Sequence, residues 1–353
     1  MSLVLGAVVF FIAHRLTRAL CSPSSPLCIV DRPNSRSLHT QPTPRTGGVA
    51  ILGGLLTGLV AAHLVALTGP ARWTAMGDPA VLVILAMAAL LGAVSFWDDT
   101  RGLRIAARLA VQASAASVVV VAGGLSIRSA TVPGVGSLDL GAAGPVVSIV
   151  LLMWMANLYN FMDGMDGFAG GMTVAGFGFL ALIGAQAGHE TLATLSTLIA
   201  AASAGFLVHN LPPARIFMGD TGSVSLGFLA AALILLGVRD GIFDVWVPLL
   251  IFSPFVVDAT VTLLRRLGRL EKFWRPHREH YYQRLVLAGW GHRKTLIAEY
   301  GLMVACGATA CIYWQARDHG RLLLLIAWAV VYALLVLGIH AVQGKNTESR
   351  QCE

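Results

Sequence analysis

Long apolar stretches recur along the whole chain and alternate with short polar connections. A membrane-spanning helix needs roughly 20 mainly apolar residues. About eleven stretches meet this requirement: 1–20, 47–69, 79–97, 105–124, 144–162, 167–187, 190–209, 222–238, 245–263, 295–315 and 320–340. The pattern therefore predicts an all-α fold, a polytopic membrane bundle of about eleven transmembrane helices. With 56% hydrophobic and 12% charged residues, one membrane domain over residues 1–353 fits better than two soluble domains.

Basic residues are distributed unevenly between the two predicted faces. If the N-terminus lies outside and the spans alternate, only five of the 25 Lys and Arg residues fall on the outer side: Arg72, Arg128, Arg239, Arg317 and Arg321. Cytoplasmic loops carry an excess of Lys and Arg, so the count favours N-out and C-in. This bias explains the net charge of +7 without any nucleic-acid partner. A basic inner rim also suits anionic membrane lipids and nucleotide phosphates.

The connections on the predicted inner side carry the distinctive residues. They lie near 21–46, 98–104, 157–167, 210–223 and 264–294. Long loops in compact bundles are usually functional or disordered, and the dense Arg, His and aromatic content of the first and last argues against disorder. Carboxylates at the ends of membrane helices are costly and usually functional. The sequence therefore places the chemistry on the cytoplasmic face.

Two adjacent carboxylates, Asp98 and Asp99, follow the apolar run 79–97. On a helix they point about 100° apart, and close together they repel unless a cation holds both ionised. Mg²⁺ suits such ligands and is commonly held by one or two carboxylates plus substrate phosphates. The alternative is a solvated helix end paired with Arg101 or Arg104.

A second polar group closes the run 144–156. Asn157, Asn160 and Asp163 are spaced three apart and share a broad helix face. The glycines beside Asp166 allow a break that turns this residue back toward the same cavity. These amides and carboxylates offer donors and acceptors for a sugar or a base. An Asx-rich turn is the alternative, but a turn would not need two asparagines inside the end of a span.

A third group opens the run from 224. Asp220 stands in Gly-Asp-Thr-Gly-Ser and can cap the following helix, whose N-terminus attracts phosphate. Phe217 could stack on a base, and Asn210 begins the segment. An ordinary helix cap is the alternative reading of this short motif.

The last polar loop carries two histidines among arginines. His277 and His280 are three apart, but no cysteine or third clustered histidine completes a zinc site. With Arg278 and Arg284 alongside, anion binding is the better role; a solvated basic loop is the alternative. The first loop adds donors between rigid turns: Arg36, His39 and Arg45.

Taken in order, these motifs resemble the polyprenyl-phosphate N-acetylhexosamine-1-phosphate transferases. This family includes phospho-N-acetylmuramoyl-pentapeptide transferase and UDP-GlcNAc:undecaprenyl-phosphate GlcNAc-1-phosphate transferase. The resemblance spans roughly residues 30–295. Its motifs are Pro-Asn-x-Arg-Ser-x-His, Pro-Thr-Pro-Arg-x-Gly-Gly, Asp-Asp, Asn-x-x-Asn-x-x-Asp-Gly-x-Asp-Gly, Phe-Met-Gly-Asp-x-Gly-Ser and the histidine loop.

The resemblance implies a Mg²⁺-dependent reaction, with Mn²⁺ as a substitute, at the cytoplasmic face of the bacterial inner membrane. A sugar 1-phosphate passes from a UDP-N-acetyl sugar to undecaprenyl phosphate, and UMP is released. Asp98 and Asp99 would position or deprotonate the lipid phosphate or help hold the metal, and Asp220 would be the metal ligand. The sequence leaves open whether a carboxylate first forms a covalent phospho-enzyme or only activates the lipid phosphate. His280 and its arginine neighbours would hold the diphosphate. The uridine and sugar pocket would be lined by Asn160, Asp163, Asp166, Asn210 and Phe217.

The histidine loop differs from that of many family members, and the difference indicates which branch of the family the chain resembles. Where they carry a run of histidines, His280 is followed by Tyr-Tyr-Gln. This pattern looks like the O-antigen-initiating branch, whose donors include UDP-N-acetylfucosamine, UDP-N-acetylquinovosamine and UDP-GlcNAc. It argues against the muramoyl-pentapeptide substrate.

Two other classes of function fit the sequence less well. A cation-coupled transporter would place acidic residues near mid-bilayer in corresponding parts of two repeats, whereas the acids here gather at one predicted face and no repeat is visible. A structural membrane scaffold leaves the Asn/Asp pattern unexplained. The sequence leaves the oligomeric state open, a homodimer included.

Overall fold

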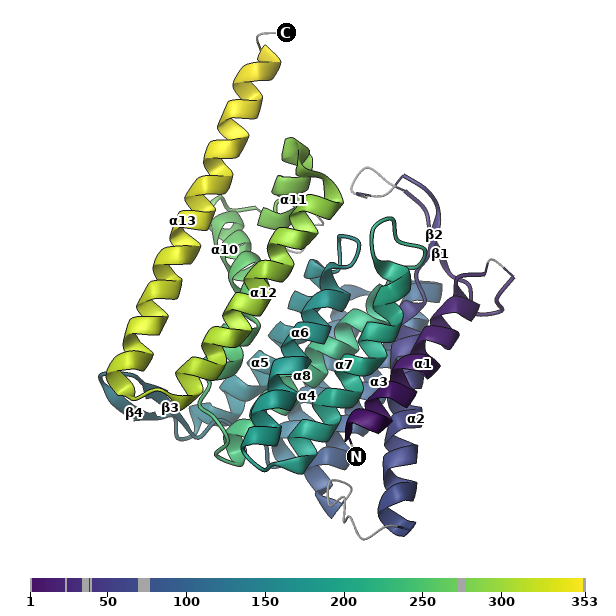
Figure 1. Ribbon diagram of the computed structural model, residues 1–353, viewed down its shortest axis with the longest axis vertical. Coiled ribbons are helices and arrows are strands. Elements are labelled where there is room, and N and C mark those ends of the chain that lie inside the picture. Colours follow the sequence, from purple (N-terminus) through teal and green to yellow (C-terminus); the bar gives the residue numbers. More distant parts are fainter. Residues whose placement is uncertain are drawn as a thin grey trace.

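Helices make up nearly all the regular structure of the computed structural model, which describes residues 2–22, 24–33, 38, 40–68, 77–271 and 277–351, with side chains described as far as 342 (Figure 1). The first helices are α1 (Ser2–Leu20), α2 (Gly47–Thr68), α3 (Pro79–Arg101), α4 (Ile105–Val121), α5 (Ala143–Met162), α6 (Phe168–Gln186) and α7 (Glu190–Asn210). They are followed by α8 (Gly219–Arg239), α9 (Trp246–Ile251), α10 (Ser253–Gly268), α11 (Tyr281–Leu285), the π-helical η2 (Val286–Trp290), α12 (Gly291–Gln315) and α13 (Asp318–Gln351).

Nine helices in the described part of the chain are long and apolar enough to cross a membrane. Two further predicted spans correspond to α4, which has only 17 residues, and to α9 and α10, which follow one another with a break at Phe252. The protein is therefore an all-helical, multi-pass membrane protein, as the hydrophobic pattern predicts. Which face is cytoplasmic stays a prediction.

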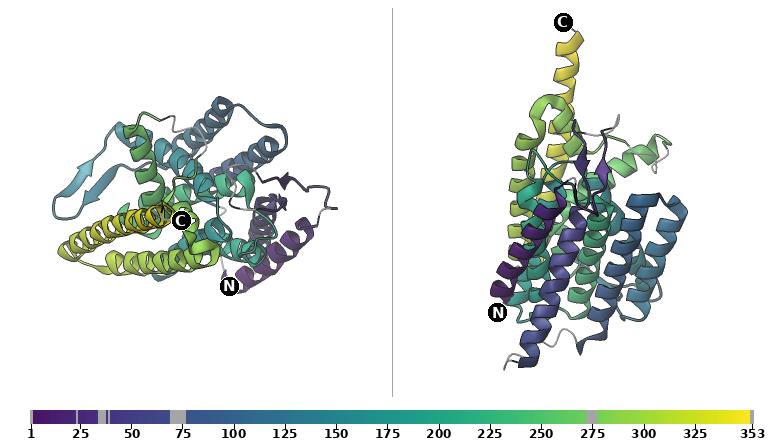
Figure 2. Two further views of the ribbon diagram at one scale, coloured as in Figure 1. Left: turned by 90° about the horizontal axis from the view of Figure 1, so that it is seen from above. Right: turned by 90° about the vertical axis from the view of Figure 1, so that its right-hand side faces the viewer.

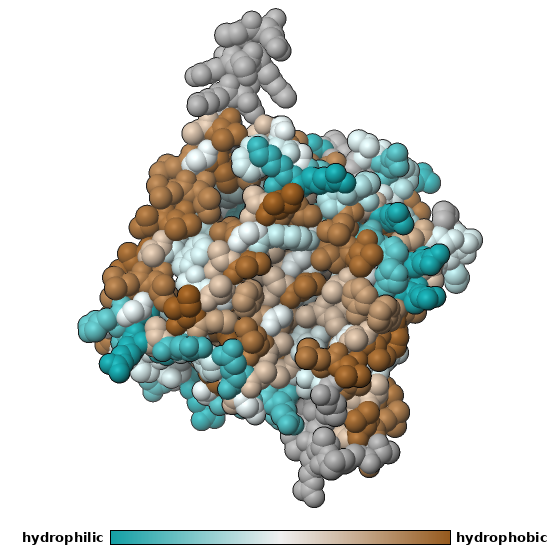
Figure 3. All heavy atoms as spheres, in the orientation of Figure 1, coloured by the Kyte–Doolittle hydropathy of each residue, from teal (hydrophilic) through white to brown (hydrophobic). Residues whose placement is uncertain are grey.

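Two short antiparallel hairpins lie at opposite ends of the bundle (Figure 1). The first pairs β1 (Val30–Asp31) with β2 (Thr43–Pro44), and the second pairs β3 (Ser129–Val132) with β4 (Gly136–Asp139). Figure 2 shows α12 and α13 side by side at one edge of the bundle. The hydrophobic surface lies mostly between hydrophilic groups near the two ends, as expected for a protein embedded in a bilayer (Figure 3).

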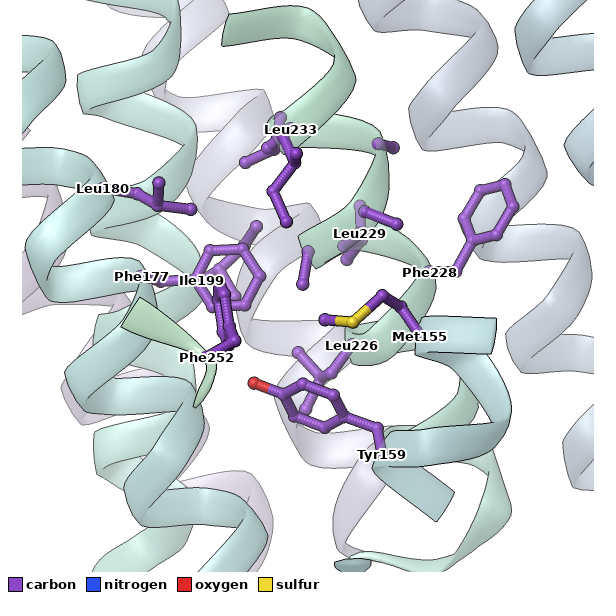
Figure 4. Packing of buried hydrophobic residues seen from close by; sticks show 14 of the residues in the cluster. Met155, Tyr159, Phe177, Leu180, Ile199, Leu226, Phe228, Leu229, Leu233 and Phe252 are labelled. Atoms are coloured by element: carbon purple, nitrogen blue, oxygen red, sulfur yellow. The ribbon is translucent and has the colours of Figure 1, made fainter. Parts of the chain in front are cut away.

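Helix α8 lies at the centre of the bundle. Every residue from Thr221 to Gly237 is buried, mainly against α2, α3 and α5. Its side chains meet Met155 and Tyr159 of α5 and the ring of Phe252 at the α9–α10 break (Figure 4). Because α8 is packed on all sides, its N-terminal turn is held firmly, and that turn carries Asp220.

Candidate active site

The turn that begins α8 is held by backbone hydrogen bonds to the start of α2. The N–H groups of Gly47 and Gly48 donate to the carbonyl oxygens of Phe217 and Met218, at 2.9 and 2.8 Å. These bonds satisfy donors that a helix N-terminus would otherwise leave without partners. The Gly47-Gly48 pair and the Phe217-Met218 pair, which are far apart in the sequence, therefore lie side by side next to Asp220.

Asp220 is bound by side chains from two other helices. Its Oδ1 accepts a hydrogen bond from Asn160 Nδ2 of α5 (2.8 Å), and its Oδ2 lies 3.4 Å from Arg108 Nη1 of α4. The same Arg108 nitrogen lies 2.8 Å from Asp98 Oδ2 at the end of α3. One guanidinium thus bridges two of the carboxylates that the sequence singled out. Asp220 remains 29% exposed, so a substrate can reach it.

Asp99 faces different partners from Asp98. Its side chain is only 3% exposed and lies 3.5 Å from Arg45 Nη2, which also donates to the Asp99 backbone carbonyl at 2.8 Å. Thr221 Oγ1 of α8 donates to Asp99 Oδ2 at 3.4 Å. Asp99 is therefore joined to the first loop and to the turn of Asp220, whereas Asp98 is joined to α4.

A fourth carboxylate, Asp163, follows the end of α5 and accepts a hydrogen bond from the backbone N–H of Gly219. Burial raises the pKa of Asp163 well above its usual range, and the nearby charges of Asp220 and Asp99 raise it further. Gly219 has a φ of +72°, and a Cβ there would overlap the Arg45 carbonyl oxygen. A glycine at 219 is therefore needed for this close approach.

Asn210 and Asp166 contact backbone groups. The buried Asn210 amide accepts from the Gly167 N–H (3.0 Å) and donates to the Ile216 carbonyl (2.8 Å). Asp166 Oδ2 accepts from the Ala214 N–H at 3.0 Å. Both side chains tie the α5–α6 turn to the segment before α8. Their predicted contact with the nucleotide sugar stays a prediction.

A cavity of about 40 Å³ lies between these helices. Its polar lining comprises Ser95, Asp98, Arg108, Gln112, Asn157, Asn160 and Asp220. Asn157 Nδ2 donates to Gln112 Oε1 at 2.6 Å, so this amide is held across the cavity wall. A cavity needs about 10–15 Å³ to hold one water molecule, so this one has room for only a few. The cavity is therefore too small to hold a nucleotide.

A magnesium ion fits the chemistry of this group of oxygens. Across the described ranges, no three His, Cys, Asp or Glu side chains converge closely enough to hold a metal alone. Mg²⁺, however, is commonly bound by one or two carboxylates together with substrate phosphates. Asp220 and its neighbour Asp99 supply such carboxylates. The predicted metal ligands are thus compatible with the structure, and the metal stays a prediction.

The histidine loop reaches the same end of the bundle. The buried His280 lies with Nδ1 3.1 Å from Asp258 Oδ1 of α10, and its ring stacks on that of His277. Two residues on, Tyr282 Oη donates to the carbonyl of Phe161 in α5 at 3.4 Å. The loop is therefore packed directly on the turn that carries Asp163.

The predicted arginine ligands are arranged differently from one another. Arg284 Nη2 lies 3.2 Å from His340 Nδ1 of α13, and its guanidinium covers the ring of Tyr281. Arg278 is half-buried beside His277. Arg284 is thus directed toward α13, so its predicted contact with the diphosphate would require a different side-chain orientation.

The predicted residues on α3, α5 and the N-terminal turn of α8 converge: Asp98, Asp99, Asn157, Asn160, Asp163 and Asp220, with Arg45 and Phe217 at their edge. Two others, Arg36 and His39, lie outside the described residues. The sequence reasoning missed Arg108 and Gln112. Their spacing of four puts both on one face of α4, and this was the signal that could have found them.

One prediction arises from His277. Burial, together with the neighbouring His280 and Arg266, lowers the pKa of His277 to about 4. In the unfolded chain its pKa is about 6.5. As the pH falls from about 6.5 to about 4, the unfolded chain binds an extra proton, so the folded protein loses stability over that window. Thermal unfolding should show a smaller fall in Tm between pH 7 and pH 4.5 for His277→Gln than for the wild type. Equal falls in both would contradict this account.

The sequence is similar to those of known glycosyl transferases. The sequence profile described as glycosyl transferase family 4 matches residues 81–238, from α3 to α8. A probable undecaprenyl-phosphate N-acetylglucosaminyl 1-phosphate transferase of Bacillus subtilis is 30% identical over 301 residues, covering 83% of this chain and 81% of the relative. The chain belongs to this family of polyprenyl-phosphate N-acetylhexosamine-1-phosphate transferases.

Other members show how widely the similarity extends. A decaprenyl-phosphate N-acetylglucosaminephosphotransferase of Mycobacterium tuberculosis is 32% identical, covering 90% of this chain and 84% of the relative. A phospho-N-acetylmuramoyl-pentapeptide-transferase of Mycobacteroides abscessus is 30% identical, covering 77% of this chain and 84% of the relative. The resemblance found in the motifs is thus confirmed at the level of the family.

Proposed function

We propose that this transferase moves an N-acetylhexosamine 1-phosphate from a UDP-sugar to undecaprenyl phosphate. An oxygen of the lipid phosphate attacks the phosphorus attached to the sugar, the bond to the bridging oxygen breaks, and UMP leaves. The product is a lipid diphosphate sugar. Several relatives are named for GlcNAc transfer, so UDP-GlcNAc is the first donor to test, followed by UDP-N-acetylfucosamine and UDP-N-acetylquinovosamine.

The observation that carries this proposal is the convergence of carboxylates and cations at the ends of α3, α4, α5 and α8. Phosphoryl transfer requires in-line positioning and neutralisation of spread negative charge rather than covalent help from the protein. Arg108 and Arg45 supply fixed positive charge beside Asp98, Asp99 and Asp220. The partly exposed side chain of Asp220 leaves room for a diphosphate.

Asp220, with Asp99 beside it, would hold the magnesium ion. When bound, the ion would neutralise charge on the diphosphate oxygens. Asp98 would position or deprotonate the lipid phosphate. Asn157, Asn160 and Asp163 would face the donor, and His280 with His277 would bind its diphosphate. Since Glu279 N–H donates to His277 Nδ1 (3.3 Å), the neutral His277 ring would donate from Nε2.

The proposed setting is the cytoplasmic face of the bacterial inner membrane, as the initiating step of O-antigen or another surface polysaccharide. The support is the 20 to 5 division of the 25 Lys and Arg residues between the predicted faces, and the single His280 followed by Tyr-Tyr-Gln.

The test is an assay of UMP release by the purified protein with Mg²⁺, undecaprenyl phosphate and a panel of UDP-N-acetyl sugars. We expect UMP with at least one donor, and loss of release when EDTA removes the metal. UMP release that persists in EDTA would contradict the metal's role. Substrate counterflow in vesicles without any UMP release would favour transport instead.

A further inference from the structure

A buried carboxylate of α10, Asp258, holds the start of α11. Its Oδ1 lies 3.1 Å from His280 Nδ1 and accepts from the Tyr281 N–H at 3.0 Å, and its Oδ2 accepts from the Tyr282 N–H at 3.1 Å. Thr262 Oγ1 donates to Oδ1 at 3.2 Å. Both partners of the His280–Asp258 pair are less than one-tenth exposed. Asp258 therefore joins three consecutive residues of the histidine loop.

These contacts determine which nitrogen of His280 carries a proton. The backbone N–H groups and the Thr262 hydroxyl are donors, and a carboxylate only accepts. The proton of the His280–Asp258 hydrogen bond is therefore on Nδ1. In the neutral ring this leaves Nε2 without a proton, and in the charged ring Nε2 becomes a donor. An orienting group on one ring nitrogen commonly fixes the other in this way.

The segment fixed by Asp258 leads directly to the carboxylate site. Tyr282 contacts Phe161 through its hydroxyl and packs on Phe168 with ring centroids 4.7 Å apart. Phe168 in turn packs on Phe255 of α10 at 4.8 Å. A cluster of three aromatic rings therefore connects α10 and α11 to the start of α6, next to the turn of Asp163. A shift of α11 relative to α10 would displace His280 with respect to that turn.

We propose that Asp258 is a positioning residue that acts through His280: it orients the imidazole and holds a proton on Nδ1, so that in the charged ring the Nε2–H donates to the donor's diphosphate. This inference rests on the proposed function, because it assigns His280 a contact with the substrate. Asp258 itself touches no reacting atom. Its effect on turnover passes through the ring of His280.

Glu279 provides the matched control. It ties the same segment to α10, with Oε2 2.9 Å from Arg265 Nη2 and Oε1 2.6 Å from Arg266 Nη1. Burial alone would raise the pKa of Glu279, but the charges of Arg266 and Arg265 outweigh it, so this pKa is lowered. Glu279 thus holds the loop electrostatically without touching His280 Nδ1.

The experiment compares Asp258→Asn, Asp258→Glu, His280→Ala, the double variant Asp258→Asn/His280→Ala, and Glu279→Gln in the UMP-release assay. In Asp258→Asn, one carboxylate oxygen is replaced by an NH₂ group, which cannot accept from the N–H groups that Asp258 now binds. This variant should therefore lower kcat/KM by about 10- to 100-fold, as loss of an orienting partner of a functional histidine does. Asp258→Glu should recover part of this loss. Glu279→Gln should lower kcat/KM less than Asp258→Asn does, because it leaves the contacts of Asp258 with residues 280–282 in place.

The double variant decides between positioning and general support of the loop. If Asp258 acts through His280, Asp258→Asn should have no further effect in the His280→Ala background. Independent, multiplying losses would overturn the proposal, as would wild-type activity of Asp258→Asn. Thermal unfolding of each variant checks the fold, and Thr262→Val, which removes only one donor to Asp258, should lose less activity.

A second readout keeps this inference separate from the proposed function. In protein labelled with ¹⁵N-histidine, the nitrogen shifts of His280, assigned by comparison with His280→Ala, report which ring nitrogen is protonated. We expect protonated Nδ1 in the wild type and loss of this preference in Asp258→Asn. A proton on Nε2 alone in the wild type would overturn the positioning role even if UMP release were never observed.

Discussion

Asp220→Asn is expected to lower UMP release by at least about 10²–10³-fold, the scale seen when one fixed charge-stabilising group is lost from an active site. Asparagine preserves the size of the side chain and can still accept from Asn160. It removes the negative charge that faces Arg108 and that would bind the metal. The measurement is the initial rate of UMP release over a range of Mg²⁺ concentrations.

Asp240→Asn is the control, because Asp240 follows the other end of the same helix. It pairs with Arg239 at 2.7 Å and with His189 at 3.1 Å, at the end of α8 opposite to Asp220 and the carboxylates around it. Its variant should keep activity within about twofold, as substitutions away from buried features generally do. If Asp220→Asn retained wild-type turnover at every Mg²⁺ concentration, Asp220 could not be the metal ligand.

Gly48→Ala is expected to be the most damaging change among residues without functional groups. A Cβ at position 48 would overlap backbone atoms of Gly222, so the N-terminal turns of α2 and α8 would have to separate. Overpacking of this kind costs about 1–3 kcal/mol of stability. Because the turn that shifts carries Asp220, a displacement of about 1 Å would also cost about 10²-fold in turnover. Thermal unfolding and UMP release measure the two effects.

Gly178→Ala is the matched substitution. Gly178 lies within α6, and a Cβ there would meet no atom within 4 Å. Alanine at such a helical position should be neutral or stabilising by up to about 1 kcal/mol. Equal stability and activity in Gly48→Ala and the wild type would mean that the contact between α2 and α8 is looser than the structure has it.

The helices could be predicted almost completely from the sequence, because long apolar runs are a strong signal. The exceptions have physical reasons. The run 245–263 is predicted as one span from its length and apolar content, although Ser253-Pro254 within it is typical of the start of a new helix. The structure has its break there, at Phe252 between α9 and α10. The connection between the predicted spans 105–124 and 144–162 forms the hairpin of β3 and β4, which the hydrophobic pattern does not predict. Strands this short leave little periodicity to detect.

The carboxylates and amides of the site could also be predicted, because polar residues at the ends of apolar helices stand out. Their partners could not. Arg108 looks like one more basic residue of a cytoplasmic rim until the fold sets it between Asp98 and Asp220. Asp258 is 22 positions from His280, and only the fold of α10 against α11 brings them together.

In the proposed reaction, the phosphate attached to the sugar moves with the sugar to the lipid. The most direct measurement uses a UDP-N-acetyl sugar labelled with ³²P in that phosphate, together with Mg²⁺ and undecaprenyl phosphate. The account predicts that the label enters the lipid phase in a one-to-one ratio with the sugar, while unlabelled UMP remains in water. Transfer of the sugar with the label left in water-soluble UDP, or no lipid product from any donor, would contradict it.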